Sequence, residues 1–473
     1  MVQPPRPAGV PIRAAIVALG LAACHAHGTA PECEGLRALA IAHVDITSAR
    51  AVGGAAPFCL VDAYAHPVAG SAIHFEVAIP TGAWSGRYVQ IGNGGFAGEV
   101  PDDEIRAAAL RGDAAAGTDD GHASHRAIDA SWALGHPVQV VDFGYRAVAE
   151  THDAALAIVR ASRHEPARFR YFTGCSDGGR EALMEAQRYP DAFDGIVAGA
   201  PANHATRLLA AFAWFQAQLV EPGAYIAASK LPAIEHAALA ACGDAAGVIE
   251  DPRACHFDPA VLRCTGAEDD RCLTGAQVAA LAKLYAGPGW YPGLEPGGEA
   301  EAGGWADWIT GSGPGEPGRA VDLRFAATYF RYMVFGDPHL DLRGLDFERD
   351  IAATEAKLGP ILDASSPDLA AFAHHGGKLI QWHGWNDQAI PPRDSIAYYE
   401  QVRAKLGDPS AFYRLFLVPG MLHCEGGRGP REVPALDALE NWVEHGRAPD
   451  RMIAPGTTRP ATWTLCPYPS TRC

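Results

Sequence analysis

The sequence predicts an α/β fold with one large inserted segment, and three observations lead to that prediction. Strand and helix patterns alternate over residues 72–202, and the alternation resumes over residues 372–445. Between them, residues 203–371 lose the alternation and contain stretches rich in Pro and Gly. Alternating strands and helices are typical of a parallel sheet with right-handed crossovers. We therefore expect one sheet built from both flanking parts of the chain.

The N-terminal residues resemble a bacterial export signal. Two arginines precede the apolar run Ala14–Ala23, which is long enough for a signal peptide and too short to span a bilayer. The run ends in Leu21-Ala22-Ala23-Cys24, which is similar to a lipobox, in which Cys24 would be lipidated and anchor the chain to a membrane. Ordinary cleavage between Ala26 and Ala30 is the alternative. We assign residues 1–24 to the signal peptide and lipobox. The expected product is an exported protein, either a periplasmic or outer-membrane lipoprotein or a secreted one.

The composition limits the possible partners. Hydrophobic residues make up 48% of the chain, enough for a large core, and the formal net charge is −17. Because nucleic acids bind to positively charged surfaces, this charge argues against a nucleic-acid partner. No later apolar run is long enough to span a membrane, and nothing in the sequence implies a protein partner.

The first predicted strands lead into a glycine-rich loop. Ala72–Pro80 and Arg87–Ile91 alternate apolar and polar residues as strands do. The second runs directly into Gly92–Gly98, a loop whose backbone N–H groups can approach a reacting carbonyl group. A tight loop without a catalytic role is the alternative interpretation. Val138–Phe143 is then predicted to be a strand and Ala147–Ser162 a helix.

The motif Gly174-Cys175-Ser176-Asp177-Gly178 is the centre of the functional prediction. Phe169–Thr173 before it is predicted to be a strand, and Gly178–Tyr189 after it a helix that ends before Pro190. A serine on such a sharp strand-to-helix turn is typical of a nucleophile elbow. The strained backbone exposes the hydroxyl, and the flanking glycines avoid collisions across the turn. A buried strand, Phe193–Ala200, follows.

Residues 203–371 are predicted to form a lid over the site. They contain helical patterns at Leu231–Ala241 and Thr274–Tyr285 and four of the cysteines. Aromatic residues also concentrate here, and for any single one a place in the lid's own core is the alternative to a place in a substrate pocket. They are Trp214, Trp290, Tyr291, Trp305, Trp308, Phe325, Tyr329, Phe330, Tyr332 and Phe335.

Two further strands and two helices complete the α/β pattern. The strands are predicted at Lys378–Trp382 and Ala411–Val418, and the helices at Arg393–Leu406 and Val433–His445. The loop after each strand carries residues of catalytic type, which is where α/β-hydrolases place the partners of the nucleophile.

Ser176, Asp387 and His423 are the candidate catalytic residues. A serine nucleophile needs a base to accept its proton and an acid to orient the protonated imidazole. In α/β-hydrolases these groups follow the chain order Ser, Asp, His, and Asp387 and His423 fit both the order and the loops. His383 competes as the base but precedes the acid, and is better explained as support for the turn. Asp394 competes as the acid but falls in the first turn of a predicted helix, where a carboxylate is favoured anyway.

The cysteines indicate disulfide bonds. Without Cys24 there are ten, an even number in a chain predicted to enter an oxidising compartment. The spacing does not determine the connectivity, but eight of them form neighbouring pairs: Cys33 and Cys59, Cys242 and Cys255, Cys264 and Cys272, and Cys466 and Cys473. Cys175 and Cys424 remain, and they adjoin Ser176 and His423. A bond between these two would bring the nucleophile and its base together.

The chain resembles the tannase and feruloyl esterase family, which includes enzymes that hydrolyse mono(hydroxyethyl) terephthalate. The family signature is Cys-Ser, Asp and His-Cys, found here at Cys175-Ser176, Asp387 and His423-Cys424. Five further stretches are similar, namely Gly92–Gly98, Asp142–Arg146, Gly174–Arg180, Phe193–Pro201 and Tyr329–Pro338. The resemblance extends from about Cys33 to the C-terminus.

The resemblance implies a fold, an activity and a disulfide pattern. The expected fold is an α/β-hydrolase domain formed by residues 25–202 and 372–473, with a lid at 203–371. The expected oxyanion hole combines the N–H of Asp177 with the loop at Gly94 and Gly95. The family also implies the bond between the two signature cysteines and the four neighbouring pairs. The activity implied is a serine carboxylesterase acting on small esters of hydroxybenzoic, hydroxycinnamic or terephthalic-type acids.

One departure from the family concerns calcium. The lid in this family usually carries a calcium-binding loop with several aspartates. Here Cys242 is followed by Gly-Asp-Ala-Ala-Gly-Val-Ile, which is about four residues shorter, has Ala246 in place of the last aspartate and keeps only Asp244 nearby. Because calcium takes six to eight oxygen ligands, we expect no calcium, no other metal and no cofactor, with Cys242–Cys255 closing the loop alone.

Two other activities fit the same residues. One is acyl transfer or amide hydrolysis by the same triad, and the other is an envelope binding lipoprotein that has lost turnover. Within the lid, Arg331 is a candidate partner for a substrate carboxylate, although a structural role is the more ordinary explanation. Ile390, three residues after Asp387, suggests an apolar wall near the acyl group.

Overall fold

A nine-stranded mixed sheet organises the part of the protein that the computed structural model describes, residues 33–311, 320–456, 461–470 and 473. The strand order is β1-β2-β3-β5-β4-β6-β7-β8-β9. Neighbours from β1 to β5 pair antiparallel, and neighbours from β5 to β9 pair parallel. The strands are β1 Val44–Val52, β2 Phe58–Ala65, β3 Ile73–Pro80, β4 Arg87–Ile91, β5 Ala114–Thr118, β6 Phe169–Cys175, β7 Gly195–Gly199, β8 Lys378–Gly384 and β9 Tyr413–Val418. A separate hairpin pairs β10 Met452–Pro455 with β11 Thr462–Leu465.

Helices cover both faces of the sheet. On one face, Ile158 of α3, Leu183 of α4 and Val402 of α12 belong to a single buried cluster with the strands. On the other face, Leu439 of α13 packs on β7 and β8, and Ile105 of α1 packs on β3 and β5. These helices are α1 Asp102–Leu110, α3 Ala147–Arg163, α4 Asp177–Arg188, α12 Pro392–Leu406 and α13 Ala435–His445. The α/β fold expected from the sequence is therefore confirmed.

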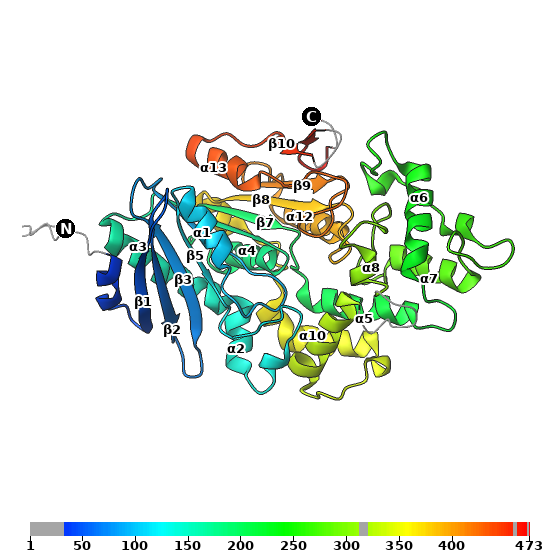
Figure 1. The fold of residues 1–473 in the computed structure, drawn as a ribbon, viewed down its shortest axis with the longest axis horizontal. Coiled ribbons are helices and arrows are strands. Elements are labelled where there is room, and N and C mark those ends of the chain that lie inside the picture. The colour runs from blue at the N-terminus through cyan, green and yellow to red at the C-terminus, as the bar shows by residue number, and fades with distance from the viewer. Residues whose placement is uncertain (1–32, 312–319, 457–460, 471–472) are drawn as a thin grey trace, which may run out of the picture.

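The chain between β7 and β8 is helical and contains the predicted lid, residues 203–371. Figure 1 shows α6 and α7 of this insertion at the end of the molecule opposite β1. Its helices are α5 Ala205–Leu219, α6 Leu231–Cys242, α7 Gly275–Ala286, α8 Trp305–Trp308, α9 Val321–Thr328, α10 Phe347–Leu362 and α11 Ala370–His375. All of them except α11 share a buried cluster with Phe96 and Phe143 of the flanking segments, so the insertion packs directly on the loops at the sheet edge.

One predicted strand is wrong. Val138–Phe143 forms helix α2 (Pro137–Val141) and the start of a π-helical segment, Asp142–Arg146, that leads into α3. Pro137 occupies the first turn of α2, where its fixed φ and missing N–H are tolerated. The β-branched residues favoured a strand, but Val140 and Phe143 instead pack against the insertion.

Five disulfides join the ten cysteines as the sequence suggested. They are Cys33–Cys59, Cys175–Cys424, Cys242–Cys255, Cys264–Cys272 and Cys466–Cys473. Such a set fits a protein of an oxidising, extracytoplasmic compartment. The predicted signal peptide and lipobox, with Cys24, lie outside the described residues. Among the residues described, no helix is long and apolar enough to cross a membrane.

Candidate active site

Ser176 lies on the sharp turn between β6 and α4. Its backbone has φ 66° and ψ −118°, a conformation that a residue with a side chain adopts only when its surroundings impose it. A Cβ on Gly174 would lie 2.6 Å from the backbone carbon of Gly178, and a Cβ on Gly178 would lie 2.8 Å from the carbonyl oxygen of Asn93. The two glycines of the motif are therefore required by close backbone approaches on each side of the serine.

The structure brings the three candidate catalytic side chains into one hydrogen-bonded chain. The Oγ of Ser176 lies 2.8 Å from Nε2 of His423, and Nδ1 of His423 lies 2.7 Å from Oδ2 of Asp387. Asp387 follows β8 and His423 follows β9, at the same edge of the sheet as Ser176. This arrangement can transfer the serine proton to an imidazole oriented by a carboxylate.

Asp387 is buried and fully satisfied by donors. Its Oδ1 accepts the N–H groups of Ala389 and Ile390 at 2.8 and 2.7 Å. Its Oδ2 accepts hydrogen bonds from His423 and, at 3.2 Å, from Nε2 of His383. Burial alone would raise the pKa of Asp387. The charge of His423 and the hydrogen bonds from both imidazoles outweigh burial and hold that pKa well below its usual range.

The two competing candidates lie elsewhere in the network. His383 contacts Asp387 and is bonded to Ser395 and to the carbonyl of Ile390, with no bond to Ser176 among its contacts in the described residues. Asp394 is bonded to His204 rather than to His423. Sequence reasoning missed one partner of the base, Gln388, whose Oε1 accepts the backbone N–H of His423 at 3.2 Å.

The predicted oxyanion donors lie beside the nucleophile. Asp177 is the first residue of α4, and the first N–H groups of a helix have no acceptor within it. Gly95 and Asp177 line the same cavity as Ser176, whereas the Cα of Gly94, one residue earlier, faces open space. Within the described chain, the N–H groups of these three residues donate to no protein acceptor. The N–H groups of Asp177 and Gly95 are thus available to a bound oxyanion.

Glu181 anchors the oxyanion loop to α4. Its Oε2 accepts the N–H of Asn93 at 2.9 Å, and the N–H of Gly178 donates to the carbonyl of Asn93 at 2.6 Å. The side-chain amide of Asn93 also donates to the carbonyl of Thr118 at 2.6 Å. Asn93 is thus held on three sides, and the loop that follows it is fixed relative to Ser176.

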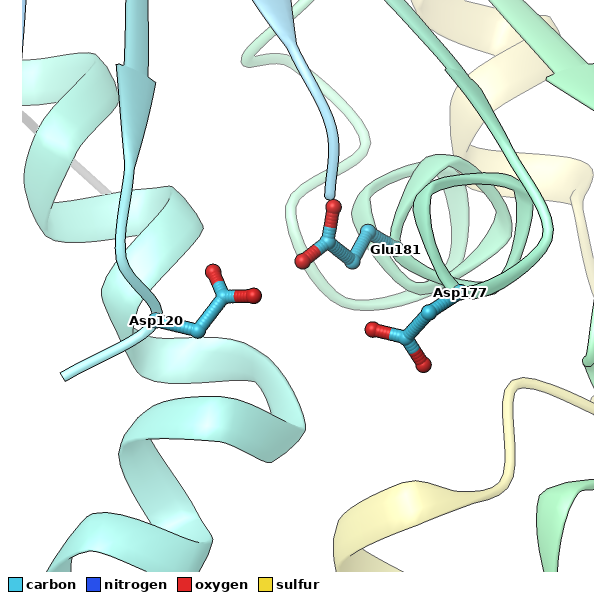
Figure 2. Close-up of side chains that lie close together, drawn as sticks. All are labelled: Asp120, Asp177 and Glu181. Carbon is cyan, nitrogen blue, oxygen red and sulfur yellow. The ribbon is translucent and has the colours of Figure 1, made fainter. Parts of the chain in front are cut away.

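A buried group of three carboxylates lies behind this loop. Figure 2 shows Asp120, Asp177 and Glu181 directed toward one another, and their ligand atoms lie within 4.8 Å. Arg180 donates to both oxygens of Asp177 at 2.6 and 2.9 Å. Burial raises the pKa of Glu181 to about 7 and that of Asp120 well above its usual range, since each carboxylate is also close to the charge of another. The group therefore favours retained protons over three full negative charges.

Cys175 and Cys424 form a disulfide next to the nucleophile and its base. Their Cα atoms are 6.0 Å apart and 249 residues separate them in sequence. Because Cys175 precedes Ser176 and Cys424 follows His423, the bond ties the nucleophile directly to its base. Cys424 has φ 61°, so the backbone on the histidine side is also held in an unusual conformation.

Comparison with known proteins places this geometry in a family. A family model described as tannase and feruloyl esterase matches residues 59–472. The chain belongs to the tannase and feruloyl esterase family. The resemblance seen in the sequence is confirmed, and the protein is a carboxylic ester hydrolase.

Several relatives in the tannase and feruloyl esterase family cover most of the chain. An uncharacterised esterase of Xanthomonas campestris pv. campestris is 40% identical, over 87% of this chain and 81% of its own. The mono(2-hydroxyethyl) terephthalate hydrolase of Piscinibacter sakaiensis is 32% identical, over 84% of this chain and 78% of its own. The crystal structure of feruloyl esterase B from Aspergillus oryzae is 26% identical, with a TM-score of 0.83 over 92% of this chain and 95% of that chain.

Beside the triad of this family member lies a cavity with apolar walls. The insertion contributes Leu208, Leu209, Phe212, Trp308, Phe325 and Leu362, and the flanking parts contribute Phe96, Phe143, Ala389 and Ile390. The aliphatic wall expected at Ile390 is confirmed. Of the ten aromatic residues singled out in the sequence, Trp308 and Phe325 line the cavity, whereas Trp305, Tyr329 and Phe330 are buried in the insertion core. No sequence signal identified Phe96, Phe143 or Phe212, because they come from three separate segments.

Arg331 lies away from this cavity. Its Nε donates to the carbonyl of Leu340 at 3.1 Å, and it lines a different cavity with Arg126, Arg324 and Arg343. Arg180 also lines the catalytic cavity, and most of its guanidinium N–H groups are already hydrogen-bonded. Besides Asp177, it donates to the carbonyls of Gly144 at 2.7 Å and Phe143 at 3.1 Å.

The short loop after Cys242 does not fit the calcium site of the tannase and feruloyl esterase family. The Oδ1 of Asp244 is turned onto its own backbone, where it accepts the N–H groups of Ala246 at 2.8 Å and Val248 at 3.2 Å. The loop therefore satisfies its one carboxylate internally. Calcium takes six to eight oxygen ligands, several of them charged, and residues 243–249 offer one carboxylate.

Proposed function

We propose that this protein is a serine carboxylesterase that hydrolyses esters of aromatic acids through an acyl-enzyme. The observation that carries the proposal is the hydrogen-bonded chain from Ser176 through His423 to Asp387 beside an apolar cavity. Relatives named feruloyl esterase and mono(2-hydroxyethyl) terephthalate hydrolase, which are named for esters of aromatic acids, support the substrate class.

The proposed reaction follows from the positions of these groups. Ser176 Oγ attacks the ester carbonyl as Nε2 of His423 takes its proton, and Asp387 stabilises the imidazolium. The N–H groups of Asp177 and the loop at Gly94 and Gly95 would hold the negative oxygen of the tetrahedral intermediate, and one such donor contributes about 100- to 1,000-fold to kcat. His423 then protonates the leaving alcohol. Water, activated by the same imidazole, releases the acid and restores Ser176.

The cavity favours acyl rings without a charged substituent. Its walls are aromatic and aliphatic, which suits stacking and edge contacts with a planar ring. Arg180 is already paired with Asp177, and four of its five N–H groups donate to Asp177 and two backbone carbonyls, so little of its charge is left for a substrate carboxylate. A buried carboxylate without a partner is strongly disfavoured, so we expect cinnamate-type and benzoate-type esters to react faster than terephthalate half-esters.

Ester hydrolysis by protein lacking residues 1–24 tests this proposal. The substrates are methyl cinnamate, methyl ferulate, methyl gallate, mono(hydroxyethyl) terephthalate and p-nitrophenyl acetate, with Ser176→Ala as the control. We expect kcat/KM to be highest for an uncharged aromatic ester and activity to be lost in the variant. Hydrolysis of p-nitrophenyl acetate alone would contradict the aromatic substrate class, and equal activity in Ser176→Ala would contradict the nucleophile.

We also propose that the protein is exported and anchored to a membrane through a lipid on Cys24. The proposal rests on the lipobox-like sequence Leu21-Ala22-Ala23-Cys24 and on the five disulfides. Metabolic labelling with a fatty-acid analogue should mark the full-length chain and not Cys24→Ala. Release of the unlabelled protein into the medium would instead support secretion.

No cofactor is proposed. The loop at Asp244 supports a lid that needs no calcium, and the triad chemistry requires only side chains, backbone donors and water.

A further inference from the structure

His383 places a second imidazole on the carboxylate of Asp387. It is the penultimate residue of β8 and is fully buried. Its Nε2 lies 2.8 Å from the carbonyl oxygen of Ile390 and 3.2 Å from Oδ2 of Asp387. A carbonyl oxygen can only accept a hydrogen bond. Oδ2 of Asp387 is likewise an acceptor, because the charge of His423 and the hydrogen bonds from both imidazoles outweigh burial and keep the pKa of Asp387 low. Nε2 of His383 therefore carries the proton and donates to both.

The opposite nitrogen of His383 is fixed by a chain of buried donors. Nδ1 lies 2.7 Å from Oγ of Ser395, which itself accepts from Nε2 of Gln381 at 2.6 Å. The hydroxyl of Tyr413 donates to the amide oxygen of Gln381. Since Ser395 already receives the amide proton, its own proton goes to Nδ1. Each donor thus points from Tyr413 toward Asp387, and this direction sets the tautomer of His383.

Asp387 is held at four points as a result. The N–H groups of Ala389 and Ile390 hold Oδ1, and the imidazoles of His383 and His423 share Oδ2. With only His423 on Oδ2, the carboxylate could turn about its Cβ–Cγ bond and leave the line to Nδ1. The N–H at Nε2 of His383, here called the lateral donor, opposes this rotation.

We infer that His383 is a positioning residue for catalysis, which holds Oδ2 of Asp387 in line with Nδ1 of His423 and reduces the basicity of that oxygen. The inference rests on the proposed function, since it concerns the same triad. Loss of the lateral donor leaves a carboxylate that binds the protonated imidazole more strongly and is less well aligned. Two effects follow, a lower rate of serine attack and a base that stays protonated to higher pH.

The titratable groups around His383 and Asp387 come from several elements. Tyr413 of β9 and Tyr291 of the insertion are buried, and burial raises the pKa of each phenol well above 10. Asp394 at the start of α12 is paired with His204, whose pKa is raised by Asp394 against the opposing effect of burial. The pair of Asp394 and His204 is unchanged in all the variants below, so a difference between variants reports the contact of His383 with Asp387.

The test compares His383→Leu with His383→Gln. Leucine removes the donor, whereas the terminal amide of glutamine can place an N–H near the position of Nε2. The readout is the rate at which a fluorophosphonate labels Ser176, measured against pH, together with kcat for p-nitrophenyl acetate. Labelling depends on the base and not on the identity of the ester, so failure of the aromatic-ester proposal leaves this readout intact.

We expect the fluorophosphonate to label His383→Leu about 10- to 100-fold more slowly than the wild type, and the acid limb of the pH profile to move to higher pH. His383→Gln should restore most of the rate and the position of the limb. Tyr398→Phe is the matched control, because it removes a buried hydroxyl from α12 that is bonded to Gln187 and Ser366 and not to the triad. It should leave the profile unchanged.

A folded His383→Leu with the wild-type rate and profile overturns the inference. If His383→Leu does not fold, Ser395→Ala decides, because it removes the hydroxyl that fixes Nδ1. A shift of its acid limb in the same direction supports the role of His383, and a profile identical to that of the wild type contradicts it.

Discussion

Individual residues around Ser176 are constrained more by their neighbours' backbones than by side-chain packing. Ser176 has a strained φ, and the close contacts at Gly174 and Gly178 leave no room for a Cβ on either glycine. Gly92, which directly follows strand β4, also has no room for a Cβ. A Cβ there would lie 2.7 Å from Oε2 of Glu181 and 2.8 Å from Cα of Gly178. The loop and the nucleophile therefore share one closely packed contact.

Gly92→Ala should lower kcat by about 100-fold or more, because the added Cβ displaces the oxyanion loop from Glu181. The measurement is kcat for the best ester in the substrate panel. Gly82→Ala is the control, since its Cβ would meet nothing within 4 Å. A stable Gly92→Ala enzyme with wild-type kcat would remove the loop from the mechanism.

The sequence was sufficient for the triad and insufficient for the cavity. Ser176, Asp387 and His423 each follow a strand in a characteristic order, so local patterns identified them. The walls at Phe96 and Phe212 are brought together only by the packing of the insertion on the sheet edge. The contact of His383 with Asp387 likewise depends on side-chain orientation, which periodicity does not encode.

At the scale of elements, the sequence analysis missed three strands of the sheet, β1, β2 and β5, and composition explains only the last. β6 and β9 are rich in aromatic and branched residues, and their positions were predicted. β5 is Ala-Ala-Ala-Gly-Thr, which has little intrinsic preference for a strand, yet every residue in it is buried between β3 and β4. Tertiary packing therefore determines β5, whereas β1 and β2 contain branched and aromatic residues that favour a strand and were nonetheless not predicted.

The disulfide Cys175–Cys424 should matter for rate more than the other disulfides do. The double variant Cys175→Ser/Cys424→Ser loses the tie between Ser176 and His423, and we expect kcat to fall about 10- to 100-fold. Cys466→Ser/Cys473→Ser is the matched control, because that bond lies at the C-terminus and joins no catalytic residue. Both variants should lose stability. For the shorter loop, closed by Cys466–Cys473, the free energy of unfolding should fall by at most about 2–4 kcal/mol. Equal kcat in the two variants would show that the bond does not position the triad.

The loop closed by Cys242–Cys255 should be indifferent to calcium. Asp244 is already satisfied by backbone N–H groups, so the melting temperature should not change on addition of CaCl₂ or EDTA. Cys242→Ser/Cys255→Ser should lower it under both conditions, as loss of a short disulfide loop does. A melting temperature that rises with calcium and falls with EDTA contradicts the proposal.

At the scale of the whole molecule, the formal net charge of −17 counts every Asp and Glu as ionised, although several of them are buried. Burial raises the pKa of Asp119 and of Glu299 to about 7, and raises that of Glu181 as well. The folded protein then holds protons that the unfolded chain releases near pH 4. Such groups stabilise the fold fully at low pH, and this contribution is lost as the pH rises through 7.

The free energy of unfolding should therefore fall between pH 6.5 and 8, on the order of 1–2 kcal/mol per pH unit near pH 7. His122, whose pKa burial lowers to about 4, acts in the opposite sense, but only below pH 6.5. Scanning calorimetry at constant ionic strength measures the slope. Glu299→Gln should reduce it, and a melting temperature that rises over this interval would contradict the assignment.

The insertion between β7 and β8 also determines when the site can exist during synthesis. Ser176 leaves the ribosome 247 residues before its base, His423. At roughly 5–20 residues per second, that interval lasts about 10 to 50 seconds. Throughout it the elbow can fold, yet its hydroxyl has no acceptor for the proton and no disulfide partner. A nascent chain therefore carries a serine without its base, and esterase activity that depends on the triad begins only after His423, residue 423 of 473, has been made.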